Sequence, residues 1–214
     1  RIRRRTVFHA LSQRMAARMA AEQFGLVYEE AKFLVAHLGG GVSVGAHDRG
    51  RVVDVTNGLD GEGPMSAERA GTLPALVLVE MVQKGADPAL LRREILTCGG
   101  LFAHTGTNDL REIEARCQAG EARCGEIISA LAYGVAKAVG GMAATLFEES
   151  SQGPDAVVLT GGMARSELLV EEITRRVRFL APVLALPQVD ELLALARGAQ
   201  LALQGGVPVQ SYAA

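Results

Sequence analysis

The sequence predicts an α/β domain with a mixed β-sheet and flanking helices. Early in the chain, three short apolar segments follow one another with glycine-containing turns between them, which is typical of an antiparallel meander. Later in the chain, helical and extended segments alternate, which favours parallel strands joined by helices. The 214 residues, 49% of them hydrophobic, suffice for one domain with a substantial core.

The first half of the chain contains the predicted meander. An apolar stripe at helical spacing predicts a first helix that ends near Gly25. Its residues are Val7, Leu11, Met15 and Met19, together with Ala16 and Ala20. Three strands are predicted next, at residues 33–37, 42–47 and 51–55. The glycine-rich stretch 57–64 predicts a loop. Two helices that each have proline near the start are then expected, at residues 74–84 and 88–96.

The second half of the chain predicts alternating helices and strands. Residues 98–107 are rich in glycine and predict an irregular segment, after which Asn108 is expected to cap a helix that runs through Arg116. Ser166 is expected to cap a later helix that ends near Leu180. The other predicted elements are a long buried helix, two strands and a last helix, at residues 126–147, 155–159, 182–186 and 190–203.

Composition argues against two classes of partner and favours one compartment. The net charge is −2 and the isoelectric point is about 6.1, so we expect no nucleic-acid partner. No apolar run approaches the roughly 18 residues that cross a bilayer, and no signal peptide is recognised, so we expect no membrane partner. The three cysteines are odd in number and match no metal-ligand spacing, which favours a reduced, cytoplasmic protein.

Two glycine-rich turns follow apolar strands, at residues 37–41 and 160–162. A glycine backbone can approach an anion closely and direct its N–H groups at it. Neither turn fits a Walker loop or the dinucleotide motif, and a plain tight turn explains either one by itself. Together, a meander with glycines at its first hairpin and a late strand–Gly-Gly–helix are typical of a ribonuclease-H-like ATPase domain. In such a domain the hairpin holds phosphates and the late turn lies under adenosine.

Three longer motifs resemble those of the acetate and butyrate kinases, and they resemble the butyrate kinase branch more than the acetate kinase branch. They are Val35-Ala-His-Leu-Gly-Gly-Gly-Val-Ser-Val-Gly45, Asp60-Gly-Glu-Gly-Pro-Met-Ser-Ala-Glu-Arg-Ala-Gly71 and Leu159-Thr-Gly-Gly-Met-Ala-Arg-Ser166. The resemblance extends through nearly the whole chain. It implies the acetate and sugar kinase/heat-shock/actin superfold. It also implies phosphorylation of a short-chain carboxylate by ATP with Mg²⁺, converting butyrate and ATP to butyryl phosphate and ADP.

The resemblance also implies roles for individual residues. His9 and Arg69 match residues that stabilise the transferring phosphoryl group. Glu191 matches the metal-associated glutamate, although the alignment there is ambiguous by one residue and leaves Asp190 open. Residues matching the ATP/ADP contacts are His37, Leu38, Gly39, Gly40, Gly41, Asp109, Leu110, Arg111, Gly161, Gly162, Met163 and Ala164. The departures from the acetate kinase pattern are Gln13 for a second histidine, Gly40 for an asparagine, and Ala164 and Arg165 in the late turn.

Members of this family have two domains that face each other across a cleft, and this chain matches mainly the second. Residues 1–30, which begin with an arginine-rich run, are therefore predicted to be a basic helical segment leading from a missing N-terminal domain. Residues 31–214 are predicted to be the nucleotide-binding domain. That missing domain, of about 150 residues, would supply half of the cleft. The chain alone is expected to bind ATP–Mg²⁺ weakly and to be inactive, and the family resemblance implies a homo-oligomer.

Several alternatives stay open on the residues alone. In one alternative, the kinase phosphorylates a branched-chain acid or acetate instead of butyrate. In another, the chain is a nucleotide-binding module without catalytic activity. A dinucleotide-dependent oxidoreductase is disfavoured, because a strand follows Gly41. Arg69 is also explained by a weak ion pair with Glu68, and His9 and His37 by hydrogen-bonded core positions. Glu191 is also explained as a first-turn helix acid.

Overall fold

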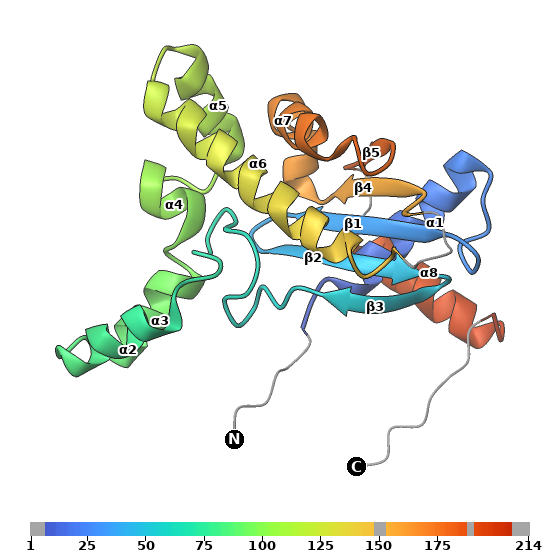
Figure 1. Ribbon diagram of the computed structural model, residues 1–214, viewed down its shortest axis with the longest axis horizontal. Helices are drawn as coiled ribbons and strands as arrows, with labels where there is room; N and C mark the ends of the chain where they lie inside the picture. Colours follow the sequence, from blue (N-terminus) through green and yellow to red (C-terminus); the bar gives the residue numbers. More distant parts are fainter. Residues whose placement is uncertain (1–6, 148–152, 188–190, 207–214) are drawn as a thin grey trace.

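The computed structural model describes residues 7–147, 153–187 and 191–206 (Figure 1). Five strands form one mixed sheet in the order β3-β2-β1-β4-β5. β1 (Lys32–Leu38), β2 (Val42–Asp48) and β3 (Arg51–Val55) are antiparallel neighbours, which confirms the predicted meander. β4 (Ala156–Thr160) pairs in parallel with β1, and β5 (Val183–Leu186) pairs in parallel with β4. The predicted α/β class with a mixed sheet is therefore confirmed.

The central position of β1 decides which loops meet. Every residue of β1 is buried, and its pairing with β4 runs from Phe33↔Ala156 to His37↔Thr160. Because parallel strands end at the same edge of a sheet, the hairpin after β1 and the turn after β4 emerge side by side. The two glycine-rich turns therefore share one edge of the sheet.

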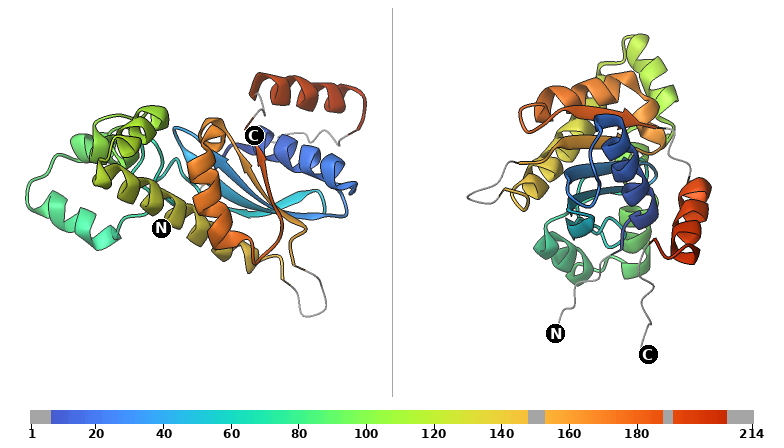
Figure 2. Two further views of the ribbon diagram at one scale, coloured as in Figure 1. Left: turned by 90° about the horizontal axis from the view of Figure 1, so that it is seen from above. Right: turned by 90° about the vertical axis from the view of Figure 1, so that its right-hand side faces the viewer.

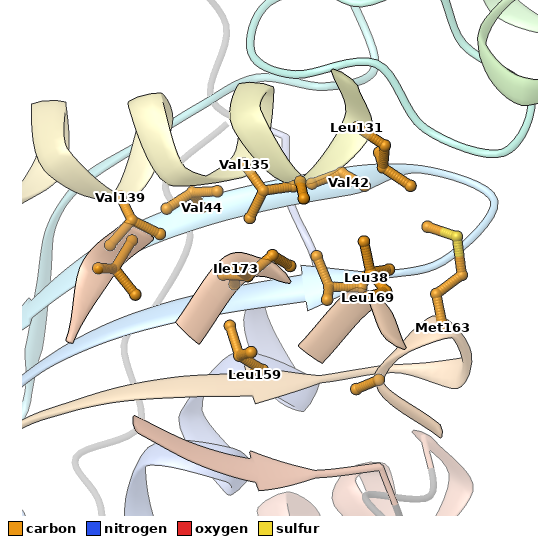
Figure 3. Close-up of a cluster of buried hydrophobic side chains, with 14 of the residues drawn as sticks. Leu38, Val42, Val44, Leu131, Val135, Val139, Leu159, Met163, Leu169 and Ile173 are labelled. Carbon is orange, nitrogen blue, oxygen red and sulfur yellow. The ribbon is translucent and has the colours of Figure 1, made fainter. Parts of the chain in front are cut away.

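Helices cover both faces of the sheet (Figure 2). α1 (Ala10–Phe24) and α8 (Glu191–Leu203) lie on one side, where α1 packs over Phe33, Val35 and Val158. α6 (Ala122–Ala143) and α7 (Glu167–Val177) lie on the other side. Figure 3 shows that core: side chains of α6 and α7 pack against Leu38, Val44 and Leu159 of the strands. Alternate strand residues thus face opposite helix layers.

The predicted apolar stripe of α1 is confirmed in part, because Ala16 and Ala20 are buried and Met15 and Met19 pack against the same core. The residues that α1 buries are Ser12, Gln13, Ala16, Ala17, Ala20 and Ala21, whereas Leu11 is 42% exposed. Small side chains let the helix approach the sheet closely, and the larger Leu11 and Met15 line a cavity of about 550 Å³ between α1 and α8. The helix ends as predicted, because Gly25 takes a left-handed conformation with φ 66°.

A helical extension projects from the end of the sheet that carries the glycine turns (Figure 1). It contains α2 (Ala75–Gln83) and α3 (Pro88–Leu96), close to their predicted bounds. The predicted irregular segment is wrong in part, because residues Gly100–Thr105 form α4. The N–H groups of Leu101 and Phe102 donate to the carbonyls of Ser66 and Ala67, so contacts with a distant loop hold this short helix.

Two predicted helix starts shift. α5 (Leu110–Gln118) is capped by Asp109 and not by Asn108, whose amide nitrogen instead donates to Glu68 Oε1 at 2.7 Å. α6 begins at Ala122 rather than at residue 126 and ends at Ala143, before the predicted residue 147. Ser166 caps α7 as predicted, with its hydroxyl accepting from Leu169 N at 2.9 Å. Across the described ranges, no helix is both long and apolar enough to span a bilayer.

Candidate active site

The two glycine turns are in direct contact. Gly161 has φ 90° and ψ 172°, a conformation that only glycine adopts readily. A Cβ on Gly161 would overlap Leu38 O and would lie 2.9 Å from the carbonyl carbon of Leu38. The backbone after β4 therefore packs against the end of β1, where the hairpin of residues 39–41 begins.

Arg69 lies against this hairpin. A Cβ on Gly41 would overlap Nη1 of Arg69 and would lie 2.8 Å from its Cζ. At Gly40, in contrast, the nearest atom to an added Cβ is Glu68 Oε2 at 3.6 Å, an ordinary contact. The hairpin therefore has room for a side chain at position 40, whereas a side chain at position 41 would displace the Arg69 guanidinium.

A buried serine fixes the loop that carries Arg69. Ser66 is fully buried, and its hydroxyl donates to Gly40 O at 2.6 Å while accepting from Arg69 N at 3.0 Å. The guanidinium donates through Nη1 to Gly58 O at 3.3 Å. In the part of the chain that the structure describes, no carboxylate forms an ion pair with Arg69. Glu68 accepts from Asn108 instead, so the ion pair considered from the sequence does not form.

His9 and His37 meet at the same edge of the sheet. His9 is the N-cap residue of α1, and its ring stacks on that of His37 with centroids 3.9 Å apart and planes 13° apart. Nδ1 of His9 lies 2.9 Å from Ser43 Oγ on β2. His37 ends the α1-facing row of β1, and Ser43 is its direct cross-strand neighbour. Burial is the main cause that lowers the pKa of His37 to about 3, and the charge of His9 is the second. His37 is therefore neutral at pH 7.

Acid is expected to destabilise the domain through two buried histidines. Burial is the main cause that lowers the pKa of His47 to about 4, and the nearby charge of Arg14 is the second. The pKa of His37 is also lowered, to about 3. Because an unfolded histidine titrates near 6.5, the unfolded chain takes up these protons first as the pH falls. Stability is thus full above pH 6.5 and declines toward pH 4. From pH 7 to 5, the free energy of unfolding should fall by about 2 kcal/mol per histidine in urea titrations.

The control for this titration is His104, which is exposed on α4. A His47→Gln variant should show roughly half of the wild-type decrease between pH 7 and 5, and a His104→Gln variant should keep all of it. Few carboxyl groups titrate in this pH range, so it isolates the histidines. A wild-type stability that is constant from pH 7 to 5 would contradict the assignment of two neutral buried histidines.

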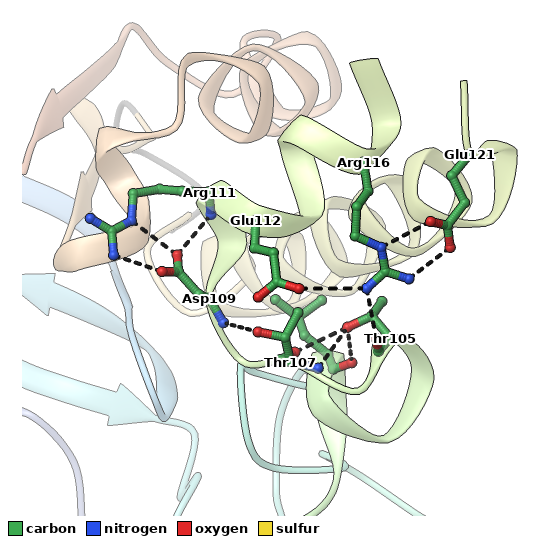
Figure 4. A network of polar contacts seen from close by, with 8 residues as sticks. Thr105, Thr107, Asp109, Arg111, Glu112, Arg116 and Glu121 are labelled. Carbon is green, nitrogen blue, oxygen red and sulfur yellow. Dashed lines mark hydrogen bonds and ion pairs between the residues drawn. The ribbon is translucent and has the colours of Figure 1, made fainter. Parts of the chain in front are cut away.

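The residues predicted to contact adenosine begin α5. Asp109 caps that helix by accepting from Arg111 N at 3.0 Å, and it also binds the Arg111 guanidinium at 2.6 and 3.0 Å (Figure 4). These hydrogen bonds from Arg111 lower the pKa of the Asp109 carboxyl. Further along α5, Glu114 accepts from the hydroxyl of Ser166. That bond links α5 to the segment after the late glycine turn, and the Arg111 side chain is 89% exposed beside it.

Some predicted contact residues can offer only their backbones. Met163 and Ala164 follow the late turn, but their side chains are 8% and 4% exposed and belong to the core on the α6 side (Figure 3). Leu38 and Leu110 are buried in the same core. These four residues therefore present backbone N–H and C=O groups, and not side chains, at the surface of this edge.

The predicted metal residue begins the last helix. Glu191 is the first residue of α8, and Asp190, the alternative, lies outside the described residues. Within the described ranges, no group of three or more histidine, cysteine or acidic side chains is arranged to hold a metal ion.

Sequence reasoning missed Ser43, Ser66 and His47. Ser43 and His47 belong to an alternating set on β2, Ser43-x-Gly45-x-His47, that points toward α1 while Val42, Val44 and Ala46 point toward α6. Polar residues at a period of two inside a buried strand were the signal that could have identified them.

Comparisons with known proteins agree with this geometry. Residues 1–190 match the acetokinase family. A probable butyrate kinase of Oleidesulfovibrio alaskensis is 50% identical over an alignment 208 residues long. The match covers 94% of this chain and 56% of the relative. The crystal structure of Porphyromonas gingivalis acetate kinase has a TM-score of 0.83 and 27% identity, covering 94% of this chain and 56% of that one. The ROK hexokinase of Thermus thermophilus shares the fold, with a TM-score of 0.52 and 21% identity. That match covers 91% of this chain and 65% of the hexokinase.

These matches cover only part of each relative. The chain spans between half and two thirds of the length of the curated relatives that it matches. The likeness to acetate and sugar kinases confirms the predicted superfold. The resemblance seen in the three motifs is confirmed along the chain, so this chain belongs to the acetokinase family.

Proposed function

We propose that this chain is the nucleotide-binding part of a carboxylate kinase that converts butyrate and ATP to butyryl phosphate and ADP. The observation that carries the proposal is the Arg69 guanidinium, held against the glycine hairpin without a carboxylate partner among the described residues. A cation kept beside two touching glycine turns suits the terminal phosphates of a nucleotide. The relative of which this chain covers 56% is named a probable butyrate kinase, which supports the choice of acid.

The reaction requires positioning more than proton transfer. A carboxylate is already ionised at neutral pH, so it attacks the γ-phosphorus without a general base. An O–P bond forms to the carboxylate, the bond from the γ-phosphorus to the β,γ-bridging oxygen breaks, and ADP leaves. Both reactants are anions, so catalysis depends on aligning them and offsetting their charge. Arg69 would bind the equatorial phosphoryl oxygens with a permanent charge, and His9 would add a second donor.

The donor groups at the hairpin suit a nucleotide, and the magnesium ion is assigned to one carboxylate. At the hairpin, glycine at position 41 lets backbone and guanidinium approach closely, as a phosphate site requires. Magnesium commonly takes one or two protein carboxylates in addition to nucleotide phosphates and water, and Glu191 is the residue that we assign to hold it. When bound, the ion would neutralise phosphate charge.

We assign the rest of the cleft to an N-terminal domain outside this chain. The additional length of the relatives supports that assignment. The acid pocket would be shared with that domain, so acetate and branched-chain acids are the alternatives to butyrate. The parent protein is expected to form a homo-oligomer.

The test is acyl phosphate formation by the parent protein, expressed from its complete reading frame. Hydroxylamine converts acyl phosphates to coloured hydroxamates, and we expect product with butyrate, ATP and Mg²⁺, and less with acetate or isobutyrate. ATP binding without product from any acid would contradict a kinase and favour the non-catalytic module. The 214-residue chain by itself should bind ATP–Mg²⁺ without forming hydroxamate, and turnover by it would contradict the shared cleft.

A further inference from the structure

We propose that a buried relay of four side chains, Tyr28, His47, Gln13 and Ser43, holds His9 in a single tautomer with its proton on Nε2. Gln13, Ser43 and His47 are thereby positioning residues for His9. That His9 then donates a hydrogen bond from Nε2 to a phosphoryl oxygen rests on the proposed function. The tautomer itself follows from the contacts alone.

The relay is continuous from the sheet edge into the protein. Ser43 Oγ lies 2.9 Å from His9 Nδ1 and 2.8 Å from Gln13 Nε2. Gln13 Oε1 lies 3.2 Å from His47 Nε2, and His47 Nδ1 lies 3.1 Å from the Tyr28 hydroxyl. Gln13 and His47 are fully buried, Ser43 is 1% exposed and Tyr28 is 4% exposed. Buried polar groups require hydrogen-bond partners, and the partners found here are other relay members, the backbone of Ser43 and the His9 ring.

The backbone carbonyl of Ser43 gives the relay its direction. A carbonyl only accepts, and Gln13 Nε2 lies 3.1 Å from it, so the nitrogen of the Gln13 amide faces Ser43 and its oxygen faces His47. His47 Nε2 must therefore carry a proton, which leaves Nδ1 to accept from the Tyr28 hydroxyl. Burial raises the pKa of Tyr28 and lowers that of His47 to about 4, so both stay neutral at pH 7.

The same reasoning continues to His9. Ser43 Oγ accepts a hydrogen bond from Gln13 Nε2. Among the described residues, His9 Nδ1 is the remaining partner of this buried hydroxyl, so the hydroxyl proton is directed at Nδ1. Nδ1 then accepts, and the ring carries its proton on Nε2. Stacking on His37 at 3.9 Å fixes the ring plane, and the Ser43 bond fixes its rotation within that plane. A single orientation with a single donor atom is what a charge-stabilising histidine needs.

Gly45 is a second observation that supports the relay. A glycine inside a strand is unfavourable unless something approaches its backbone closely. A Cβ on Gly45 would overlap Gln13 Oε1 and would lie 3.4 Å from Cδ of Gln13. Between Ser43 and His47, this glycine makes the space that the Gln13 amide occupies. Gln13 stands where acetate kinases carry a second histidine, and its amide joins both neighbours with a fixed donor–acceptor direction.

The first test measures the tautomer directly. Proton–nitrogen correlation spectra of the ¹⁵N-histidine-labelled chain distinguish protonated from unprotonated ring nitrogens for its four histidines. We expect His9 to be protonated on Nε2 alone in the wild type and to become a tautomer mixture in Ser43→Ala. Ser43→Thr retains the hydroxyl and should restore the wild-type pattern. Ser12→Ala, which alters a buried serine of α1 outside the relay, is the matched control.

The second test measures catalysis in the parent protein. Ser43→Ala should lower kcat about tenfold with the KM for ATP within twofold, and Ser43→Thr should recover most of kcat. Tyr28→Phe, at the far end, removes the hydroxyl that faces His47 Nδ1 but keeps the Gln13 oxygen that faces Nε2, so His47 should keep its proton on Nε2. A His9 tautomer that is unchanged in Ser43→Ala would overturn the relay. A shifted tautomer in a parent protein that forms no acyl phosphate would uphold the relay and contradict the proposed function instead.

Discussion

Replacing Arg69 by glutamine is expected to lower kcat for acyl phosphate formation by the parent protein about 1,000-fold. The guanidinium packs against Gly41 and, among the described residues, has no carboxylate partner, so its charge is available to the phosphoryl group. Loss of the guanidinium should mainly destabilise the transition state, in which negative charge spreads over the equatorial phosphoryl oxygens. The KM for ATP should therefore change only a few-fold in steady-state kinetics.

The Arg69→Lys variant separates charge from geometry. Lysine keeps the charge but not the planar fork, so partial activity, well below that of the wild type, is expected. Arg178→Gln, at the exposed C-terminal end of α7, should retain full activity. An Arg69→Gln enzyme that is folded and within fivefold of the wild-type kcat would rule out the assigned role.

Replacing Gly161 by alanine is expected to reduce the free energy of unfolding by about 3 kcal/mol or more. Its φ of 90° with ψ of 172° is strained for any residue with a side chain, and the added methyl would overlap the backbone of Leu38. β1 and β4 are buried along their whole length and paired to each other, so neither can move aside easily. Urea unfolding of the purified chain measures the effect.

Gly162 is the matched control for this substitution. No atom lies within 4 Å of a Cβ added there, and its φ is outside the left-handed region. Gly162→Ala should therefore change the free energy of unfolding by less than about 1 kcal/mol. Equal effects of the two substitutions would show that the contact between the turns does not hold the sheet edge together.

Strands and helix ends were predictable where they depend on neighbours in the chain. Short apolar runs bounded by turns predicted the five strands. β1 and β4 are buried at every residue and read as continuous apolar runs, whereas burial alternates along β3. Proline at residue 88 predicted the start of α3, because proline lacks the N–H group that would be unpaired in a first turn. Serine at residue 166 predicted the start of α7, because its hydroxyl accepts a hydrogen bond from such an N–H group.

Prediction failed where distant segments decide the local structure. The α4 helix forms because Leu101 and Phe102 donate to the loop carrying Ser66, and no local pattern reports that loop. Asn108 binds Glu68 rather than capping α5 for the same reason. The stripe predicted on α1 was right for Ala16 and Ala20 but wrong for Leu11, which lines the cavity between α1 and α8 and is not buried against the sheet.

The amino-acid sequence by itself determined the α/β class, the two glycine turns and, through three ordered motifs, the family. Only the tertiary structure decided that Arg69 lies against Gly41, that Gly161 touches Leu38 and that Gln13 joins Ser43 to His47. Backbone preference and periodicity are properties of residues adjacent in the chain. Contacts between segments depend on strand order and register, which are set by the packing of the whole domain.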